Sequence, residues 1–276
     1  MLRATSDGRN VIVGDYAGVI TTYCLRDRHS VAVWKRKTSL RIPVADLLIA
    51  DTSPSDHVVA SYKDGALIVW SMTKAEAVFS VRAHAFSSIQ LVQLQAHPHL
   101  FAVAGDDAKP ADPQGSQPAV SAPKGILRIF DRQQPLTRPI ASILAHKHGP
   151  GIIGLCALPD SSDLVSYGGE DQHAALHYYR QADGFSAQVV HKGAKGRIMD
   201  ATAIDAHTVA IGWSTGHLQV IDLRTHRAIA VYKTESVIIR LCYASNKIVA
   251  LTERGVLASF ALPDAHDLQQ RISLDR

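Results

Sequence analysis

Histidine is the residue type in this chain that most readily suggests chemistry, because an imidazole can ligate a metal or act as a base near neutral pH. The chain has 14 histidines. Close pairs occur at His97 and His99, at His146 and His148, and at His173 and His177. A metal site usually needs three or four converging ligands that further hydrogen bonds orient. Two histidines supply half of such a set, so the sequence predicts structural or solvated roles for these pairs and no bound metal.

Motifs for nucleophilic or nucleotide chemistry do not occur. The sequence has no Gly-x-Ser-x-Gly elbow, no phosphate-binding loop of the Walker type and no dinucleotide fingerprint. Serine, histidine and aspartate are plentiful, so a triad assembled in space is neither supported nor excluded. The sequence therefore predicts a non-catalytic protein without a cofactor.

Composition indicates a globular protein that buries a large core. Hydrophobic residues make up 46% of the chain and charged residues 20%. The formal net charge of +4 permits an acidic protein, RNA or phospholipid partner and requires none.

Three cysteines, Cys24, Cys156 and Cys242, lie in separate apolar runs. An odd, scattered set predicts reduced core residues of an intracellular protein. The first residues lack the apolar core of a signal peptide. No apolar run approaches the roughly 20 residues that span a bilayer. We therefore expect a cytoplasmic or nuclear location and no membrane insertion.

The elements that must position these residues follow a repeat. Its clearest copy is Ser61-Tyr-Lys-Asp-Gly-Ala-Leu-Ile-Val-Trp70, in which Asp64-Gly65 predicts a tight turn between two strands. Equivalents of this turn end at Gly18, Gly65, Gly125, Gln172, Gly216 and Gly255, at intervals of 47, 60, 47, 44 and 39 residues. A period of about 40 to 45 residues is typical of a four-stranded propeller blade.

The repeat resembles the blade of the WD-repeat propeller family. Ala83-His84, Ala145-His146 and Val190-His191 stand at the place of the family's Gly-His pair, Asp64 and Asp171 at its turn, and Trp70-Ser71 and Phe130-Asp131 at its Trp-Asp. No copy carries the complete set. The resemblance implies an all-β fold, a β-propeller of about six (six or seven) four-stranded antiparallel blades. It also implies that His84, His146 and His191 hydrogen-bond within the blade. In the fourth blade, the partners of Ser166 and Asp171 would be His146 or His148.

On this template the chain is a single domain, 1–276. The blades cover approximately 2–42, 43–84, 85–147, 148–192, 193–234 and 235–276. Three closures are open: a complete six-bladed ring, an open ring completed by strands of a partner, or part of a longer propeller. The stretch 105–124, rich in proline and small polar residues, predicts a disordered insertion, either a binding loop or a tolerated one.

In a propeller the connections between blades and the turns within them share one face, here called the top face. Basic clusters fall in these connections: Lys35-Arg-Lys37 with Arg41, Arg82-Ala-His84, His146-Lys-His148 and His191-Lys-Gly-Ala-Lys-Gly-Arg197. They predict a basic rim that attracts an acidic or phosphorylated segment or RNA. The alternative is that these loops are simply polar.

Candidate partner-binding residues lie in or beside these turns and connections. They are Tyr16, Tyr62, Lys63, Glu170, Lys192, Lys195, Arg197, Trp213 and Glu253. Aromatic and charged residues of this kind commonly anchor interfaces. Trp213 fits two roles equally, an interface anchor or a cap on the core of its blade.

The sequence favours a non-catalytic scaffold or adaptor subunit that binds other proteins of an intracellular multi-protein complex, a ribonucleoprotein complex included. Its partners would bind the top face or an open edge of the ring. Two alternatives stay open: a propeller hydrolase with a site at the top of the central channel, and direct RNA binding through the basic rim.

Overall fold

Strands arranged in six antiparallel sheets make up the part of the chain that the computed structural model describes. That part is residues 1–5, 8–25, 31–37, 41–49, 57–72, 74, 76–85, 87–107, 125–134, 137–146, 151–170, 173–193 and 196–262. For 31–37, 169, 170, 173, 174 and 191–193 the description covers the backbone alone.

The sheets follow one another along the chain and are numbered in that order. The first holds β1 (Leu2–Ala4), β2 (Asn10–Gly14), β3 (Val19–Cys24) and β4 (Val31–Lys37). The second holds β5 (Val44–Ile49), β6 (His57–Tyr62), β7 (Ala66–Ser71) and β8 (Glu76–Arg82). The third holds β9 (Ser87–Gln93), β10 (Leu100–Asp106), β11 (Ile126–Asp131) and β12 (Ala141–Leu144).

The fourth sheet holds β13 (Ile152–Ala157), β14 (Leu164–Glu170), β15 (His173–Arg180) and β16 (Ser186–Gly193). The fifth holds β17 (Ile198–Ala203), β18 (Thr208–Trp213), β19 (His217–Asp222) and β20 (Arg227–Lys233). The sixth holds β21 (Ile238–Ala244), β22 (Lys247–Thr252) and β23 (Leu257–Ala261). Among the described residues the only helical segment is the short 3-10 turn η2 (Gln181–Asp183), so none could span a membrane.

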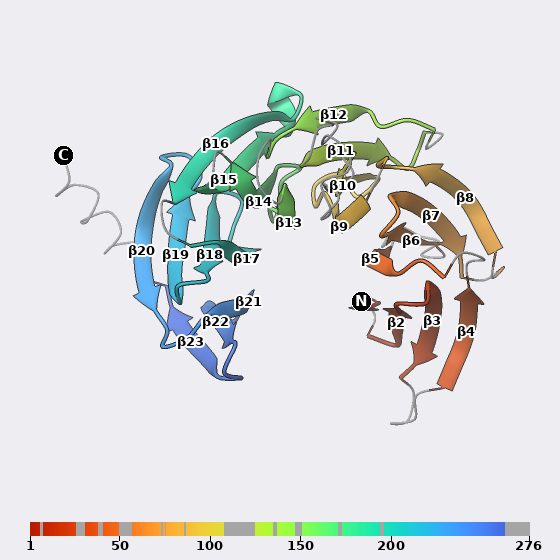
Figure 1. The fold of residues 1–276 in the computed structure, drawn as a ribbon, viewed down its shortest axis with the longest axis horizontal. Coiled ribbons are helices and arrows are strands. Elements are labelled where there is room, and N and C mark those ends of the chain that lie inside the picture. Colours follow the sequence, from red (N-terminus) through yellow and green to blue (C-terminus); the bar gives the residue numbers. More distant parts are fainter. Residues whose placement is uncertain are drawn as a thin grey trace, which may run out of the picture.

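The six sheets stand side by side around an open arc, each with its first strand nearest the centre and its last on the outside (Figure 1). This arrangement confirms the predicted all-β propeller. The first and sixth sheets lie apart at the two ends of the arc, so the described strands do not form a complete six-bladed ring. The sixth sheet has three described strands, where four were expected, and 263–276 lie outside the described residues.

In the first, second, fifth and sixth sheets, where it is described, the turn between the second and third strands has the predicted glycine. In the second sheet Asp64 Oδ1 accepts the amide hydrogen of Ala66 at 3.0 Å, which closes the turn after β6. Gly65 has a φ of +84°, and a Cβ there would lie 2.0 Å from the carbonyl oxygen of His84. Glycine is required at this position. The same positive φ recurs at Gly18, Gly125, Gly216 and Gly255.

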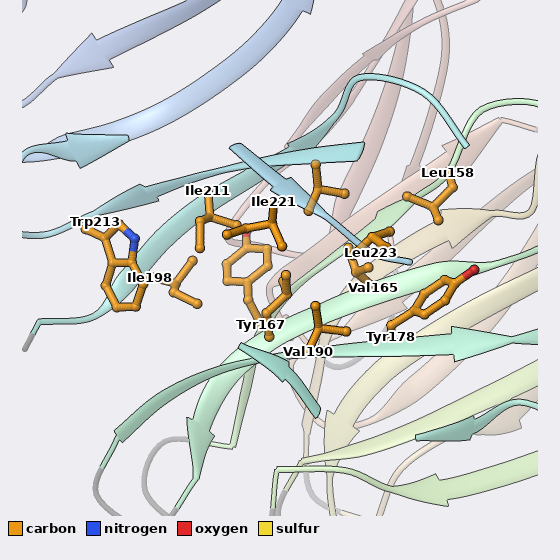
Figure 2. Close-up of a cluster of buried hydrophobic side chains, with 12 residues drawn as sticks. Leu158, Val165, Tyr167, Tyr178, Val190, Ile198, Ile211, Trp213, Ile221 and Leu223 are labelled. Carbon is orange, nitrogen blue, oxygen red and sulfur yellow. The ribbon is translucent and has the colours of Figure 1, made fainter. Parts of the chain in front are cut away.

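Each junction between neighbouring sheets buries one cluster of apolar side chains. Figure 2 shows the cluster between the fourth and fifth sheets, where Tyr167 of β14 packs against Ile211 of β18 and its neighbours. Burying a large apolar side chain contributes about 1.5–3 kcal/mol. Five such clusters join six sheets in series.

The innermost strands of the second to sixth sheets share a second feature that bears on contacts between sheets. Each has a β-bulge followed by a polar or small residue. The register shifts once in each of β5, β9, β13, β17 and β21. In three of these strands the residue after the bulge accepts a backbone amide from a later sheet. Asp46 accepts Leu91 N at 3.0 Å, Gln90 accepts Leu155 N at 2.7 Å, and Asp200 accepts Leu241 N at 2.7 Å.

Asp46 is fully buried and connects three sheets. Arg3 of β1 donates to both its carboxylate oxygens, at 2.9 and 3.1 Å, while Leu47 N and Leu91 N donate from β5 and β9. Burial raises the pKa of the Asp46 carboxyl, and the charge of Arg3 with these hydrogen bonds offsets part of that effect.

In β13 the residue after the bulge is Gly154, which has no side chain to accept an amide. A Cβ there would lie 2.1 Å from the hydroxyl of Tyr167, which fills this space. That hydroxyl donates to Asp200 of the next sheet at 3.0 Å. Burial, together with the Asp200 charge, raises the pKa of Tyr167 well above its usual range. Tyr167 therefore takes over the connecting role at this junction.

The predicted insertion 105–124 begins later than expected. Gly105 and Asp106 belong to β10, and 108–124 lie outside the described residues. Asp106 Oδ1 accepts Gly125 N at 2.7 Å, so the two described ends of this stretch are hydrogen-bonded to each other.

We predict that Asp46→Ala destabilises the fold by about 2–4 kcal/mol, because it leaves two buried amides and Arg3 without their acceptor. Asp46→Asn keeps a carbonyl oxygen for Leu91 N and should cost clearly less. Urea unfolding at neutral pH measures both, with the exposed Asp183→Ala as the control. Equal losses for Asp46→Ala and Asp46→Asn would contradict the role of the amide acceptor.

Candidate interaction surfaces

The top face is held together by backbone hydrogen bonds between turns and connections. Val44 N donates to Asp15 O and Lys63 N to Pro43 O, each at 3.0 Å. Ala83 N then donates to Gly65 O at 2.8 Å. These bonds alternate between within-sheet turns and between-sheet connections. The first two sheets therefore present their top-face residues on one continuous frame.

Tyr16 is the most exposed aromatic residue of this frame, with 89% of its surface accessible. The turn that carries it is rigid, because Asp15 Oδ1 accepts the amides of both Ala17 and Val19 at 2.8 Å. The turn therefore holds the predicted candidate Tyr16 out in solvent.

Lys63 is also exposed, in the corresponding turn of the second sheet. Arg82, at the end of β8, is exposed and donates through Nη1 to the carbonyl oxygens of Asp64 and Ala85, at 3.3 and 3.0 Å. Arg82 therefore adds hydrogen bonds that stabilise the frame, as well as a positive charge on it.

Two predicted candidates lie in the core. Tyr62 is 2% exposed, and burial raises the pKa of its hydroxyl to about 12. Trp213 is 4% exposed and packs beside Ile198 at one end of the cluster in Figure 2, while its Nε1 donates to Gln219 Oε1 at 2.9 Å. Of the two roles considered for Trp213, the structure supports the cap on the core. Neither side chain offers surface to a partner.

The remaining candidates divide between exposed residues and residues without a described side chain. Arg197 and Glu253 are exposed on the top face, where Arg197 O accepts Ser214 N at 2.8 Å and Glu253 N donates to Val237 O at 2.9 Å. Glu170 ends β14 and Lys192 lies in β16, but their side chains are outside the described part. Lys195 lies outside it altogether.

His84 joins the second and third sheets. Its Nδ1 lies 3.2 Å from Nη1 of Arg128. Because arginine only donates, Nδ1 accepts, and the proton on Nε2 points to the carbonyl oxygen of Val103 at 3.3 Å. Arg128 in turn forms a two-pronged ion pair with Asp107, its closest contact being 2.6 Å. Burial, followed by the charge of Arg128, lowers the pKa of His84 to about 4.

His146 shows the within-blade contact that the resemblance implied for the fourth sheet. Its Nε2 lies 2.8 Å from Ser166 Oγ, which is 2.7 Å from the hydroxyl of Tyr179. The ring of His177 lies against His146, with centroids 4.2 Å apart. His148 and Asp171 are outside the described residues. His146 therefore has a structural role.

The other described histidine pair, His97 and His99, lies at the opposite end of the strands. Nδ1 of His97 hydrogen-bonds Ser162 Oγ, and the two imidazole rings meet edge to face. Within the described ranges, no group of three or more histidine, cysteine, aspartate or glutamate side chains is placed to hold a metal.

A cavity of about 400 Å³ lies among the innermost strands β1, β5, β9 and β13. Arg3, Gln93, Gln95 and Cys156 supply its polar lining side chains. The described lining has neither a carboxylate nor a histidine. The arrangement of acids and bases that the hydrolase alternative requires is therefore not found around this cavity.

The outer faces of the first and sixth sheets form a second candidate surface, here called the end faces. Leu257 of β23 pairs with Leu251 on the side of the sixth sheet that turns away from the fifth, and it is 70% exposed. Leu2 of β1 pairs with Val13 on the corresponding side of the first sheet and is 61% exposed. Both end faces expose apolar side chains of the kind that every internal junction buries.

Two features of these surfaces differ from the predictions. Cys242, expected in the core, is exposed on β21, and Cys24 and Cys156 are half-buried; all three are free thiols. The connecting residues Asp46, Asp200 and Gln90 were not predicted. Their signal in the sequence is a polar residue within an otherwise apolar strand, as in Val44-Ala-Asp-Leu-Leu-Ile49.

We predict that His84 makes the fold sensitive to mild acid. The folded state keeps its pKa at about 4, whereas the unfolded chain takes up a proton near 6.5. Stability should therefore fall as pH drops from about 6.5 to 4, by up to about 3 kcal/mol from this group. Unfolding free energies of the wild type and His84→Gln, compared at neutral pH and near pH 4.5, isolate the contribution. An identical pH dependence in both would exclude it.

Comparisons with known proteins identify a fold. No family model matches the sequence, and no curated protein matches it. Among solved structures, a chain of "Crystal Structure of Mitotic Checkpoint Complex" is similar with a TM-score of 0.72 and 12% identity, and "Structure of U3-55K" with 0.71 and 11%. Each alignment covers 95% of this chain and 77% of the other. These likenesses extend to the fold alone: the chain is a β-propeller built from successive antiparallel sheets.

Proposed function

We propose that this protein is a non-catalytic scaffold or adaptor subunit that binds other proteins of a multi-protein complex. The observation that carries the proposal is the pair of end faces. Apolar side chains are buried at all five junctions inside the arc, yet the same kind of side chain is exposed at both ends. A partner that covers an end face would bury apolar surface in the way that a neighbouring sheet does.

The edge of the sixth sheet supports the same proposal. Strand β23 carries no charged residue, and its pairing with β22 is regular over five residues. The outer strands β4, β8, β16 and β20 carry bulges, whereas β12 does not, and β8 and β20 also carry charged ends. Charges and bulges are the usual protection of a strand edge against pairing. β23 is the third strand of its sheet and its described edge carries no charge, so a strand of a partner could pair along it as a fourth strand.

One of the two similar chains comes from a structure of a complex, the mitotic checkpoint complex, which is compatible with this proposal. The cytoplasmic or nuclear location expected from the sequence remains a prediction. Direct RNA binding remains an alternative, although no single feature of the described residues favours it over protein binding.

We predict that Leu257→Asp and Leu2→Asp each reduce the recovery of stoichiometric partners from native lysate by about tenfold, because a carboxylate in an apolar interface is costly. Both residues are exposed, so the fold should tolerate the change. Affinity capture with quantitative mass spectrometry provides the measurement.

Val231→Asp is the matched control, since Val231 is 57% exposed on the outer strand β20, away from both end faces. The Val231→Asp variant should recover the same partners at wild-type levels. A wild-type protein that leaves the lysate as a monodisperse monomer with nothing enriched would refute the proposal.

A further inference from the structure

The positive charge of the top face is concentrated over the first two sheets. Exposed cations there are Arg41 in the connection after β4, Lys63 in the turn after β6, and Arg82 at the end of β8. The last residues of β4, Lys35-Arg-Lys37, reach the same end of the sheet, because Lys37 pairs with Val19 directly after the first turn.

The carboxylates of this region are already engaged. Asp15 accepts two amides of its own turn, and Asp64 accepts the amide of Ala66. Asp107 is held by Arg128 and by the amide of Ala85. Among the described side chains, none of these acids forms an ion pair with Arg41, Lys63 or Arg82.

The top face over the fifth and sixth sheets has a different balance. Its described exposed cations are Arg197, Lys233 and Arg254, and the exposed acids Glu235 and Glu253 lie beside them. With Lys35-Arg-Lys37 at the end of β4, the first two sheets bring six cations to the top face beside Asp15 and Asp64, so the predicted basic rim is strongest there. This part includes the exposed Tyr16, and we call Tyr16, Arg41, Lys63 and Arg82 together the basic patch.

We propose that the basic patch binds an anionic segment of a partner protein. This inference deepens the proposed scaffold function, on which it rests, by assigning a chemical class to one partner. The side chains stand on turns joined by the bonds from Val44 to Asp15 and from Lys63 to Pro43. The protein therefore loses little conformational entropy when a carboxylate or phosphate binds, and this small loss favours high affinity.

Single-stranded RNA fits this patch less well. RNA-binding surfaces usually stack successive bases on several aromatic side chains. The basic patch has one, Tyr16, because the aromatic residue of the second turn, Tyr62, is buried. One exposed tyrosine beside separate cations is better suited to a side chain or backbone flanked by acidic residues.

The test is selection of random displayed peptides on the immobilised full chain. We expect enrichment of peptides rich in aspartate and glutamate, and the selected peptides should bind more weakly as salt rises. Arg41→Gln/Lys63→Gln should weaken them about fivefold, and Tyr16→Ala about tenfold. Arg82 is left in place because it hydrogen-bonds the frame. Phosphoserine versions of the selected peptides show which anion is preferred.

The matched control is Arg227→Gln/Lys247→Gln, which removes the same charge from exposed residues at the opposite end of the strands β20 and β22 and should leave affinity unchanged. Three results would overturn the inference. They are a selection without enrichment of acidic peptides, equal binding of the selected peptides to both double variants, and tighter binding of oligouridine RNA than of any selected peptide. If one of these results is found while Leu257→Asp still reduces partner recovery, the scaffold proposal stands and only the inference about the basic patch fails. If Leu257→Asp does not reduce partner recovery, the scaffold proposal itself fails.

Discussion

Buried acceptors on the innermost strands are the constraint on which this fold depends. Neighbouring sheets of a propeller do not share a strand ladder, so the backbone amides exposed at each bulge need another acceptor. Asp46, Gln90 and Asp200 supply it, each for a sheet other than its own. A buried carboxylate is costly unless it is fully hydrogen-bonded. Arg3 and Tyr167 complete the bonding of the two aspartates.

This central bonding explains why the surface residues are well placed. With the inner strands fixed and one apolar cluster at each junction, neighbouring sheets have little freedom to turn against each other. The top face adds a hydrogen bond across sheets, because Asp15 O of the first turn accepts the amide of Val44 in the second sheet. Binding residues on such a frame lose little conformational entropy when a partner arrives.

The sequence was informative about periodic features and less so about individual side chains. Turn glycines and alternating strands recur at the blade period, and they predicted the all-β propeller correctly. Burial depends on contacts between sheets, which one sequence does not display. Tyr62 and Trp213 lie three residues before their turn glycine and are buried, whereas Tyr16 lies two residues before its glycine and is exposed. Asp46 could have been noticed, because a charge inside an apolar strand requires a buried partner.

The two candidate surfaces use different physics, and this difference is useful for assembly. The end faces offer apolar area, whose burial is nearly independent of ionic strength. The basic patch offers exposed charge, whose attraction is screened over about 8–10 Å at physiological salt. A partner held at an end face would therefore stay bound while one at Lys63 and Arg41 exchanges. A propeller with both surfaces can keep one subunit permanently and recruit another reversibly, and it needs no conformational change to do so.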